Sequence, residues 1–150
     1  MTLLFQNLLI WHVILGILAI FFSVTVLLGL LKNAGLKKLK TFSLLGVLGF
    51  FVSWILGGYY YVNYYGSSVK PAIKSGNYPW AHGIFMETKE HIFLFIPFLS
   101  LVSALAIWLL REKIQTEPKL KKPLIFLSFL IVALGAAITF MGMLVSGAVK

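Results

Sequence analysis

The amino-acid sequence predicts an all-α integral membrane protein, a four-helix bundle made by a single four-span domain over residues 1–150. Its composition, with 60% hydrophobic and 11% charged residues, lies far from that of a soluble globular domain. Four runs contain no Asp, Glu, Lys or Arg, and each exceeds the roughly 18 residues that indicate a bilayer-spanning helix. These runs cover residues 1–31, 41–69, 91–110 and 123–149.

The first apolar run predicts a retained transmembrane helix rather than a cleaved signal peptide. It lacks a basic start, its apolar stretch is longer than that of a signal sequence, and Lys32 follows it directly. His12, Gly16, Ala19 and Ser23 recur along it at intervals of 4, 3 and 4 residues, so they share one helical face. An ionisable side chain at membrane depth is costly and indicates a functional site. His12, about 8 Å below the predicted membrane surface, is therefore the main candidate.

Small residues form similar stripes in the second and fourth runs, where they would let neighbouring helices approach closely. The stripes include Gly46, Gly49, Ser53 and Gly57 in one run and Ser128, Gly135, Thr139 and Gly142 in the other. Deep in the membrane we interpret them as packing positions. Toward the outer leaflet, beside an interfacial belt of tyrosines, the residues that would leave space for a flat cofactor are Gly16, Gly57, Gly58 and Gly142.

The third run is predicted to belong to a longer helix that begins near Pro79 on the outer side of the membrane. Proline suits the first turn of a helix, whereas the segment 70–77 is rich in turn formers and predicts a loop. At about 100° per residue, Glu87 and His91 share one face of this helix, while His82 lies on nearly the opposite face. We therefore expect Glu87 and His91 to face the bundle.

The distribution of the net charge of +9 along the chain is explained by membrane topology and does not indicate a nucleic-acid-binding surface. Nine of the 13 basic residues lie in the first and third connections: Lys32, Lys37, Lys38, Lys40, Arg111, Lys113, Lys119, Lys121 and Lys122. Because positively charged loops stay on the cytoplasmic side, we expect a multi-pass protein of the plasma (inner) membrane with both termini outside. The lysines are then expected to meet anionic lipid of the bilayer, and no nucleic-acid partner is predicted.

The leading functional hypothesis is a b-type haem near the outer leaflet, held between His12 and His91. The first and third runs cross the membrane in the same direction, so these two imidazoles would face each other as axial ligands. Gly16, Gly57 and Gly58 would make room for the porphyrin. Such a protein would transfer electrons between a quinone or another membrane redox partner and an acceptor on the outer side.

Two alternatives stay open from the sequence. Glu87 and His91, four residues apart, would join His12 in a single non-haem site for iron, copper or zinc, or Glu87 would only orient the His91 ring beside a haem. In the second alternative, the polar residues around His91 only lie at the membrane–water interface, and the chain is a non-catalytic subunit of a larger membrane complex. The absence of cysteine excludes iron–sulfur clusters and c-type haem attachment. Whether the protein is an enzyme stays undecided.

Overall fold

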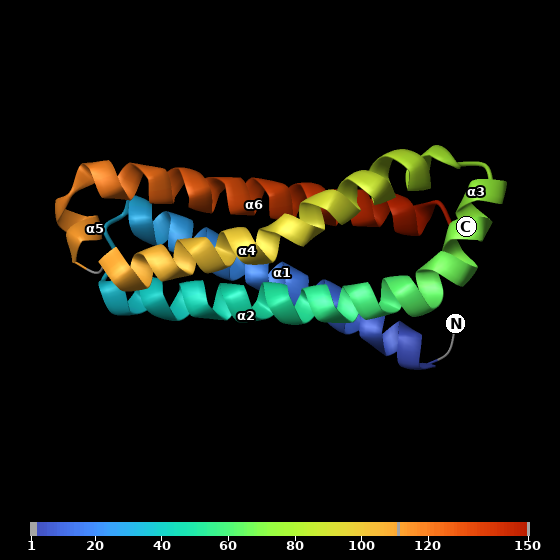
Figure 1. Ribbon diagram of the computed structural model, residues 1–150, viewed down its shortest axis with the longest axis horizontal. Helices are drawn as coiled ribbons and strands as arrows, with labels where there is room; N and C mark the ends of the chain where they lie inside the picture. Colours follow the sequence, from blue (N-terminus) through green and yellow to red (C-terminus); the bar gives the residue numbers. More distant parts are fainter. Residues whose placement is uncertain (1–2, 111, 150) are drawn as a thin grey trace.

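The computed structural model describes residues 3–110 and 112–149, and in this part of the chain it contains helices and no strands (Figure 1). Four continuous helical stretches of the described chain are long and apolar enough to cross a membrane: Leu3–Leu31, Leu36–Ser75, Ala81–Leu110 and Pro118–Gly147. The prediction of an all-α protein with four such helices is thereby confirmed. Large apolar side chains, such as Phe126 and Leu109, are exposed along these helices and form a surface that suits lipid.

Short π-helical stretches interrupt the second and third of these long helices. In chain order the elements are α1 (Leu3–Leu31), α2 (Leu36–Tyr60), η1 (Tyr61–Val69), α3 (Lys70–Ser75), η2 (Ala81–Met86), α4 (Glu87–Leu110), α5 (Lys113–Thr116) and α6 (Pro118–Gly147). The π-helical elements are η1 and η2. A π-helical turn holds more residues than an α-helical turn, and such turns occur frequently at functional sites.

The connection between the second and third long helices is shorter than the sequence predicts. The turn formers of segment 70–77 predict a loop, but Lys70–Ser75 form the helix α3, with Pro71 in its first turn. Proline is tolerated there because the first N–H groups of a helix have no intrahelical partner. The loop prediction is therefore wrong for α3. The predicted start of the third helix near Pro79 is confirmed by η2, which begins at Ala81.

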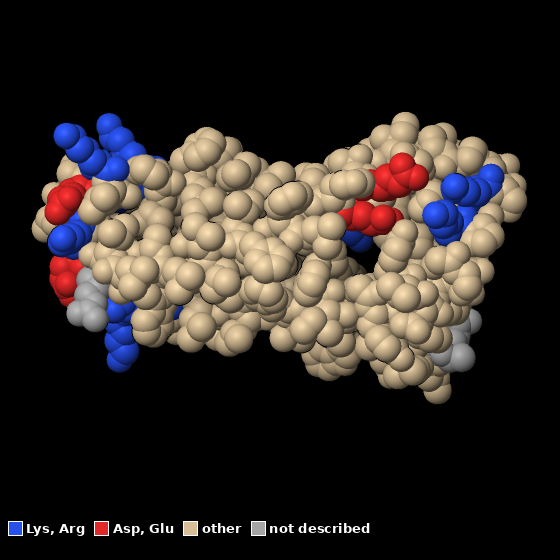
Figure 2. All heavy atoms as spheres, viewed as in Figure 1, with Lys and Arg blue, Asp and Glu red and all other residues tan. Residues whose placement is uncertain are grey.

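The two ends of the bundle differ in charge (Figure 2). Basic side chains, drawn in blue, gather at the end that carries α5 and the α1–α2 connection, which we call the basic end. Two hydrogen bonds tie the α1–α2 connection to α6 and α5: Lys121 Nζ donates to Asn33 Oδ1 (2.6 Å), and Gln115 Nε2 donates to the Ala34 carbonyl (3.0 Å). α1 begins and α6 ends at the opposite end, the terminal end (Figure 1). The predicted topology would turn the terminal end outward.

α4 changes neighbours along its length (Figure 1). Toward the basic end it packs beside α2, and toward the terminal end its N-terminal extension η2 packs beside α6. A central cluster of buried side chains joins the four long helices and consists of Ala19, Phe50, Ile96, Ile131 and Ile138. Beyond this cluster α2 and α4 diverge toward the terminal end, and their divergence makes room for the candidate site (Figure 1).

Serine side chains from all four long helices meet inside the bundle around a small cavity of about 20 Å³. They are Ser23, Ser43, Ser100, Ser103 and Ser128. The hydroxyls of Ser23 and Ser100 donate hydrogen bonds to carbonyls of their own helices. Ser128 Oγ, in contrast, is buried without a hydrogen-bond partner among the described residues. The cluster thus contains a buried hydroxyl, that of Ser128, which no described residue satisfies.

Ser128→Ala is expected to leave thermal stability unchanged or to raise it, because a buried hydroxyl without a partner costs about 1–3 kcal/mol. Ser100→Ala is the matched control. It removes a hydroxyl that donates a hydrogen bond to the Pro97 carbonyl, so stability is expected to fall by about 1 kcal/mol. Thermal unfolding of both variants in detergent micelles measures the difference. A clear loss of stability in Ser128→Ala would instead show that water fills the cavity and bonds to this hydroxyl.

Candidate functional site

A cavity of about 770 Å³ lies near the terminal end and is lined by residues of α1, α2, η1, η2, α4 and α6. Its walls are mainly apolar and aromatic, with contributions from Trp54, Phe93 and several tyrosines. The polar side chains that reach it include His12, Lys89 and Glu90. Figure 2 shows an opening into the molecule in this region, with acidic side chains at its edge and a basic side chain inside. A mostly apolar cavity with a few converging polar groups is the usual form of a small-molecule site.

His12 is held in the cavity wall by reciprocal hydrogen bonds with Ser53. Its Nδ1–H donates to the Ser53 carbonyl (2.9 Å), and the Ser53 hydroxyl donates in return to the His12 carbonyl (2.8 Å). The ring also makes an edge contact with Phe93, at 5.5 Å between centroids. Because Nδ1 carries the proton in this arrangement, the lone pair of the neutral ring lies on Nε2. Nε2 bonds to none of the residues that the structure describes, so it is available to a ligand.

The three glycines predicted as cofactor-binding have different surroundings. A Cβ atom at Gly57 would come within 2.6 Å of His12 Nδ1, so the ring fits only because position 57 has no side chain. Gly58 lines the cavity, and a Cβ there would meet nothing within 4 Å. Gly16 is not part of the cavity lining. It lies against Ser53, whose hydroxyl oxygen would be 3.2 Å from a Cβ at that position.

Lys89 and Glu90 bring charge into the cavity from the first turn of α4. Lys89 is half-buried, and its ammonium makes no ion pair with any carboxylate in the described part of the chain. Gly142 of α6 leaves room for it, because a Cβ there would stand 3.3 Å from Lys89 Nζ. Glu90 Oε1 is buried and has no hydrogen-bond partner within residues 3–110 and 112–149. The sequence interpretation missed both residues, because charges at the start of a span are ordinarily interfacial.

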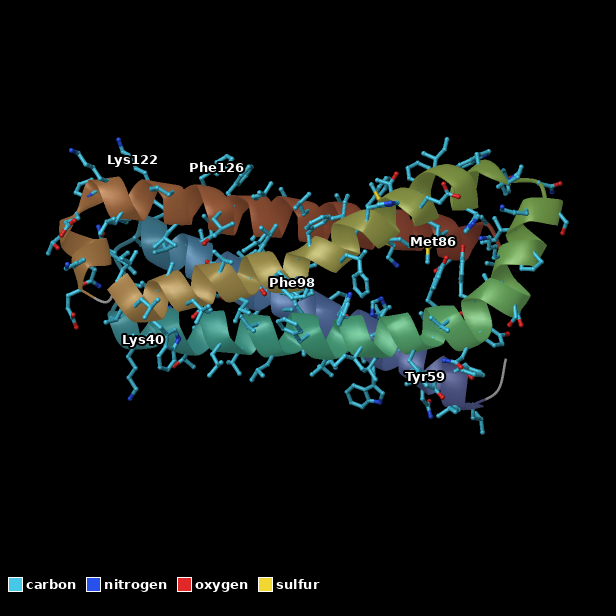
Figure 3. The ribbon with its side chains drawn as sticks, viewed as in Figure 1. Lys40, Tyr59, Met86, Phe98, Lys122 and Phe126 are labelled. Carbon is cyan, nitrogen blue, oxygen red and sulfur yellow. The ribbon has the colours of Figure 1, made fainter. Side chains whose placement is uncertain are left out.

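Glu87 and His91 lie on the outer face of α4, and neither lines the cavity. Both are exposed, and His91 Nδ1 donates a hydrogen bond to the Glu87 backbone carbonyl (2.6 Å) rather than to its carboxylate. The expectation that this pair faces the bundle is therefore wrong. Met86 and Lys89 line the cavity instead, and Figure 3 shows Met86 directed from its helix toward the space beside α2. The structure does not bring His91 into the cavity with His12.

The predicted non-haem site of His12, Glu87 and His91 is not assembled. Within the described ranges, no group of three or more His, Asp or Glu side chains lies close enough to hold a metal ion. The physical reason is the placement of the helices. His12 lies between α1 and α2, where Ser53 binds it, whereas Glu87 and His91 are exposed on α4 and do not line the cavity.

A further histidine, His82, is buried where η1, α3 and η2 cap the terminal end. Its Nδ1 is hydrogen-bonded to the Tyr65 hydroxyl (3.0 Å), and its Nε2 lies 3.9 Å from Glu87 Oε1. At that distance the carboxylate forms no hydrogen bond, and Nε2 is buried without a hydrogen-bond partner among the described residues. An ideal α-helix would place His82 and Glu87 on different faces. The π-helical turn of η2 brings them together, since it aligns residues five apart. Tyr65 lines the cavity, so His82 supports its wall.

The chain was compared with protein-family models, with curated proteins and with solved structures, and no match was found. The candidate function therefore rests on the cavity, on the fixed His12 ring and on the charged groups beside it.

Proposed function

We propose that this protein binds an amphipathic organic ligand from the bilayer in the cavity beside His12. The observation that carries the proposal is the state of His12: the hydrogen bond from Nδ1 to the Ser53 carbonyl orients its ring and leaves Nε2 for a group that enters the cavity. The apolar and aromatic walls suit a flat or chain-like hydrophobic body. Under the predicted topology, the ligand comes from the outer leaflet.

The route into the cavity runs sideways from the lipid. Ile55 of α2 and Leu94 of α4 line the cavity, and they are also 59% and 51% exposed on the surface of the bundle. Both belong to helices that are apolar enough to lie within the acyl region. A molecule already dissolved in the bilayer therefore reaches His12 without passing through water.

The protonation of His12 limits the chemistry of the head group. While Nδ1–H is bound to Ser53, Nε2 of the neutral ring accepts hydrogen bonds or binds a metal, and it donates nothing. A head group with a hydroxyl therefore suits this position better than one that carries only carbonyl oxygens. A reduced quinone and a hydroxylated lipid both combine such a hydroxyl with an apolar tail.

Haem b is the second candidate ligand. A histidine whose Nδ1–H is held by a backbone carbonyl and whose Nε2 is free has the arrangement of an axial iron ligand. Gly57 and Gly58 leave the adjacent wall without side chains. From its exposed position His91 does not supply the second ligand, so the haem would be bound through His12 alone. Its function would then be electron transfer with a membrane redox partner.

His12→Ala is expected to reduce the amount of ligand that co-purifies with the protein in mild detergent by about tenfold or more, since a buried polar contact contributes about 1–3 kcal/mol. His91→Ala is the matched control and is expected to keep the ligand, because His91 lies outside the cavity. Extraction and mass spectrometry identify an organic ligand, whereas a Soret band with a sharp reduced α band identifies haem. Equal ligand content in the two variants would remove His12 as a binding residue.

A further inference from the structure

Lys89 is a cation that forms no ion pair in the described part of the protein. It lines the cavity, and no described carboxylate forms an ion pair with its ammonium. Glu90 lines the same cavity and attracts the Lys89 ammonium, but its carboxylate forms no ion pair with it. Glu87 is exposed on the outer face, where its carboxylate lies 3.9 Å from His82 Nε2. Neither of the acids nearest in sequence therefore forms an ion pair with Lys89.

An ammonium that is half-buried at the edge of a membrane helix is costly unless it meets an anion or a dipole. The fold nevertheless keeps this ammonium within the cavity wall. Gly142 provides the space, with only 3.3 Å between Lys89 Nζ and the position that a Cβ would take. Much of the surrounding surface is apolar, from residues such as Val145 and Leu94. The arrangement is therefore that of a cation held ready for a ligand.

We infer that the head group of the ligand is anionic, with a phosphate or carboxylate oxygen bound by Lys89 and a hydroxyl bound by His12. The inference rests on the proposed function and specifies its ligand class.

The apolar part of the ligand lies toward the lipid-facing opening. Trp54 and Ile55 of α2 form one side of this route, and Leu94 of α4 forms the other. A ligand with its head at Lys89 therefore extends its tail between α2 and α4 into the acyl region of the bilayer. Such a molecule is a single-chain or double-chain anionic amphiphile rather than a water-soluble anion.

Native mass spectrometry of the detergent-solubilised protein, titrated with defined probes, tests this inference. The probes are oleate, phosphatidylglycerol and the neutral oleyl alcohol. Wild-type protein is expected to bind an anionic probe at least about tenfold more tightly than oleyl alcohol, because bonds to charged groups are the stronger ones. Comparison of the affinities for oleate and for phosphatidylglycerol shows whether the site prefers a carboxylate or a phosphate head group. Lys89→Gln is expected to abolish the preference, and Lys89→Arg is expected to retain most of it.

Lys74→Gln is the matched control, since Lys74 is exposed on α3 and does not line the cavity. It is expected to bind all three probes like the wild type. If Lys89→Gln keeps the full preference, or if wild-type protein binds oleyl alcohol as tightly as the anions, the inference is overturned while the proposed function stands. If no probe binds and nothing co-purifies with wild-type protein, the proposed function fails as well.

Thermal unfolding shows whether Lys89→Gln folds. If it does not, a second variant tests the same inference. Gly142→Val fills the space beside Lys89 Nζ without removing the charge from the chain. It is expected to displace the ammonium and to lower the preference for anionic probes by about tenfold. An unchanged preference in this folded variant contradicts the inference.

Discussion

Gly57→Ala is expected to displace His12 and the ligand beside it, whereas Gly58→Ala leaves His12 in place. A Cβ at position 57 would lie 2.6 Å from Nδ1 and 2.7 Å from Cε1 of the His12 ring. A shift of the ring away from position 57 breaks the hydrogen bond between Nδ1 and the Ser53 carbonyl. Overpacking of this kind costs about 1–3 kcal/mol. At position 58 of the same helix, a Cβ would meet nothing within 4 Å.

Thermal unfolding in detergent micelles and the amount of co-purified ligand measure this pair of variants. Gly57→Ala is expected to melt at a lower temperature and to lose most of its ligand, while Gly58→Ala is expected to melt at the wild-type temperature or slightly above it. A Gly57→Ala protein with normal stability and full ligand content would show that the His12 ring moves freely. The hydrogen bonds with Ser53 would then have no part in positioning it.

The second large effect is expected at Gly49, where α2 meets α1 at close range. A Cβ at this position would lie 2.9 Å from Ala19 Cβ and 3.4 Å from both Ala19 Cα and the Leu15 carbonyl oxygen. None of these atoms moves by rotating a flexible side chain, so the two helices must separate. Gly49→Ala is therefore expected to destabilise the protein by about 1–3 kcal/mol.

Gly46→Ala is the control within the same interface. The nearest atom to a Cβ at Gly46 is Ser23 Oγ at 3.6 Å, which is ordinary contact. Alanine also loses less backbone entropy than glycine on folding, so this variant is expected to be neutral or stabilised by up to about 1 kcal/mol. The melting temperatures of the two variants are the measurement. Equal destabilisation at positions 46 and 49 would mean that helix separation at Gly49 is not the cause.

The existence of the four long helices was predictable because a segment in lipid must satisfy its own backbone hydrogen bonds. The ends of the helices were less predictable. Segment 70–77 contains residues that form turns in water, yet Lys70 and Pro71 begin the helix α3. The reason is that Pro71 falls in a first turn, where a missing N–H breaks no hydrogen bond. Hydropathy therefore predicts that a membrane helix exists, whereas the residue at which the helix ends depends on local features such as the position of a proline.

His12 and Gly57 were predictable as neighbours because a polar side chain and a line of small residues mark the faces on which α1 and α2 meet. Lys89 was not predictable as a site residue. Apolar side chains such as Phe95 and Ile96 occur on both the exposed and the buried sides of α4, so their pattern does not identify the inward face. That face is set by packing against α2 and α6, which turned Lys89 inward and His91 outward.

The reciprocal hydrogen bonds between His12 and Ser53 also set the axial alignment of α1 on α2. Sliding one helix by a single residue moves it by about 1.5 Å and turns it by about 100°, which breaks both bonds at once. Apolar side chains do not fix the alignment in this way, because their free energy in lipid is nearly the same at every depth in the acyl region. The first two helices therefore meet in one alignment. The depth of the His12 imidazole in the membrane is determined as soon as this helical hairpin forms.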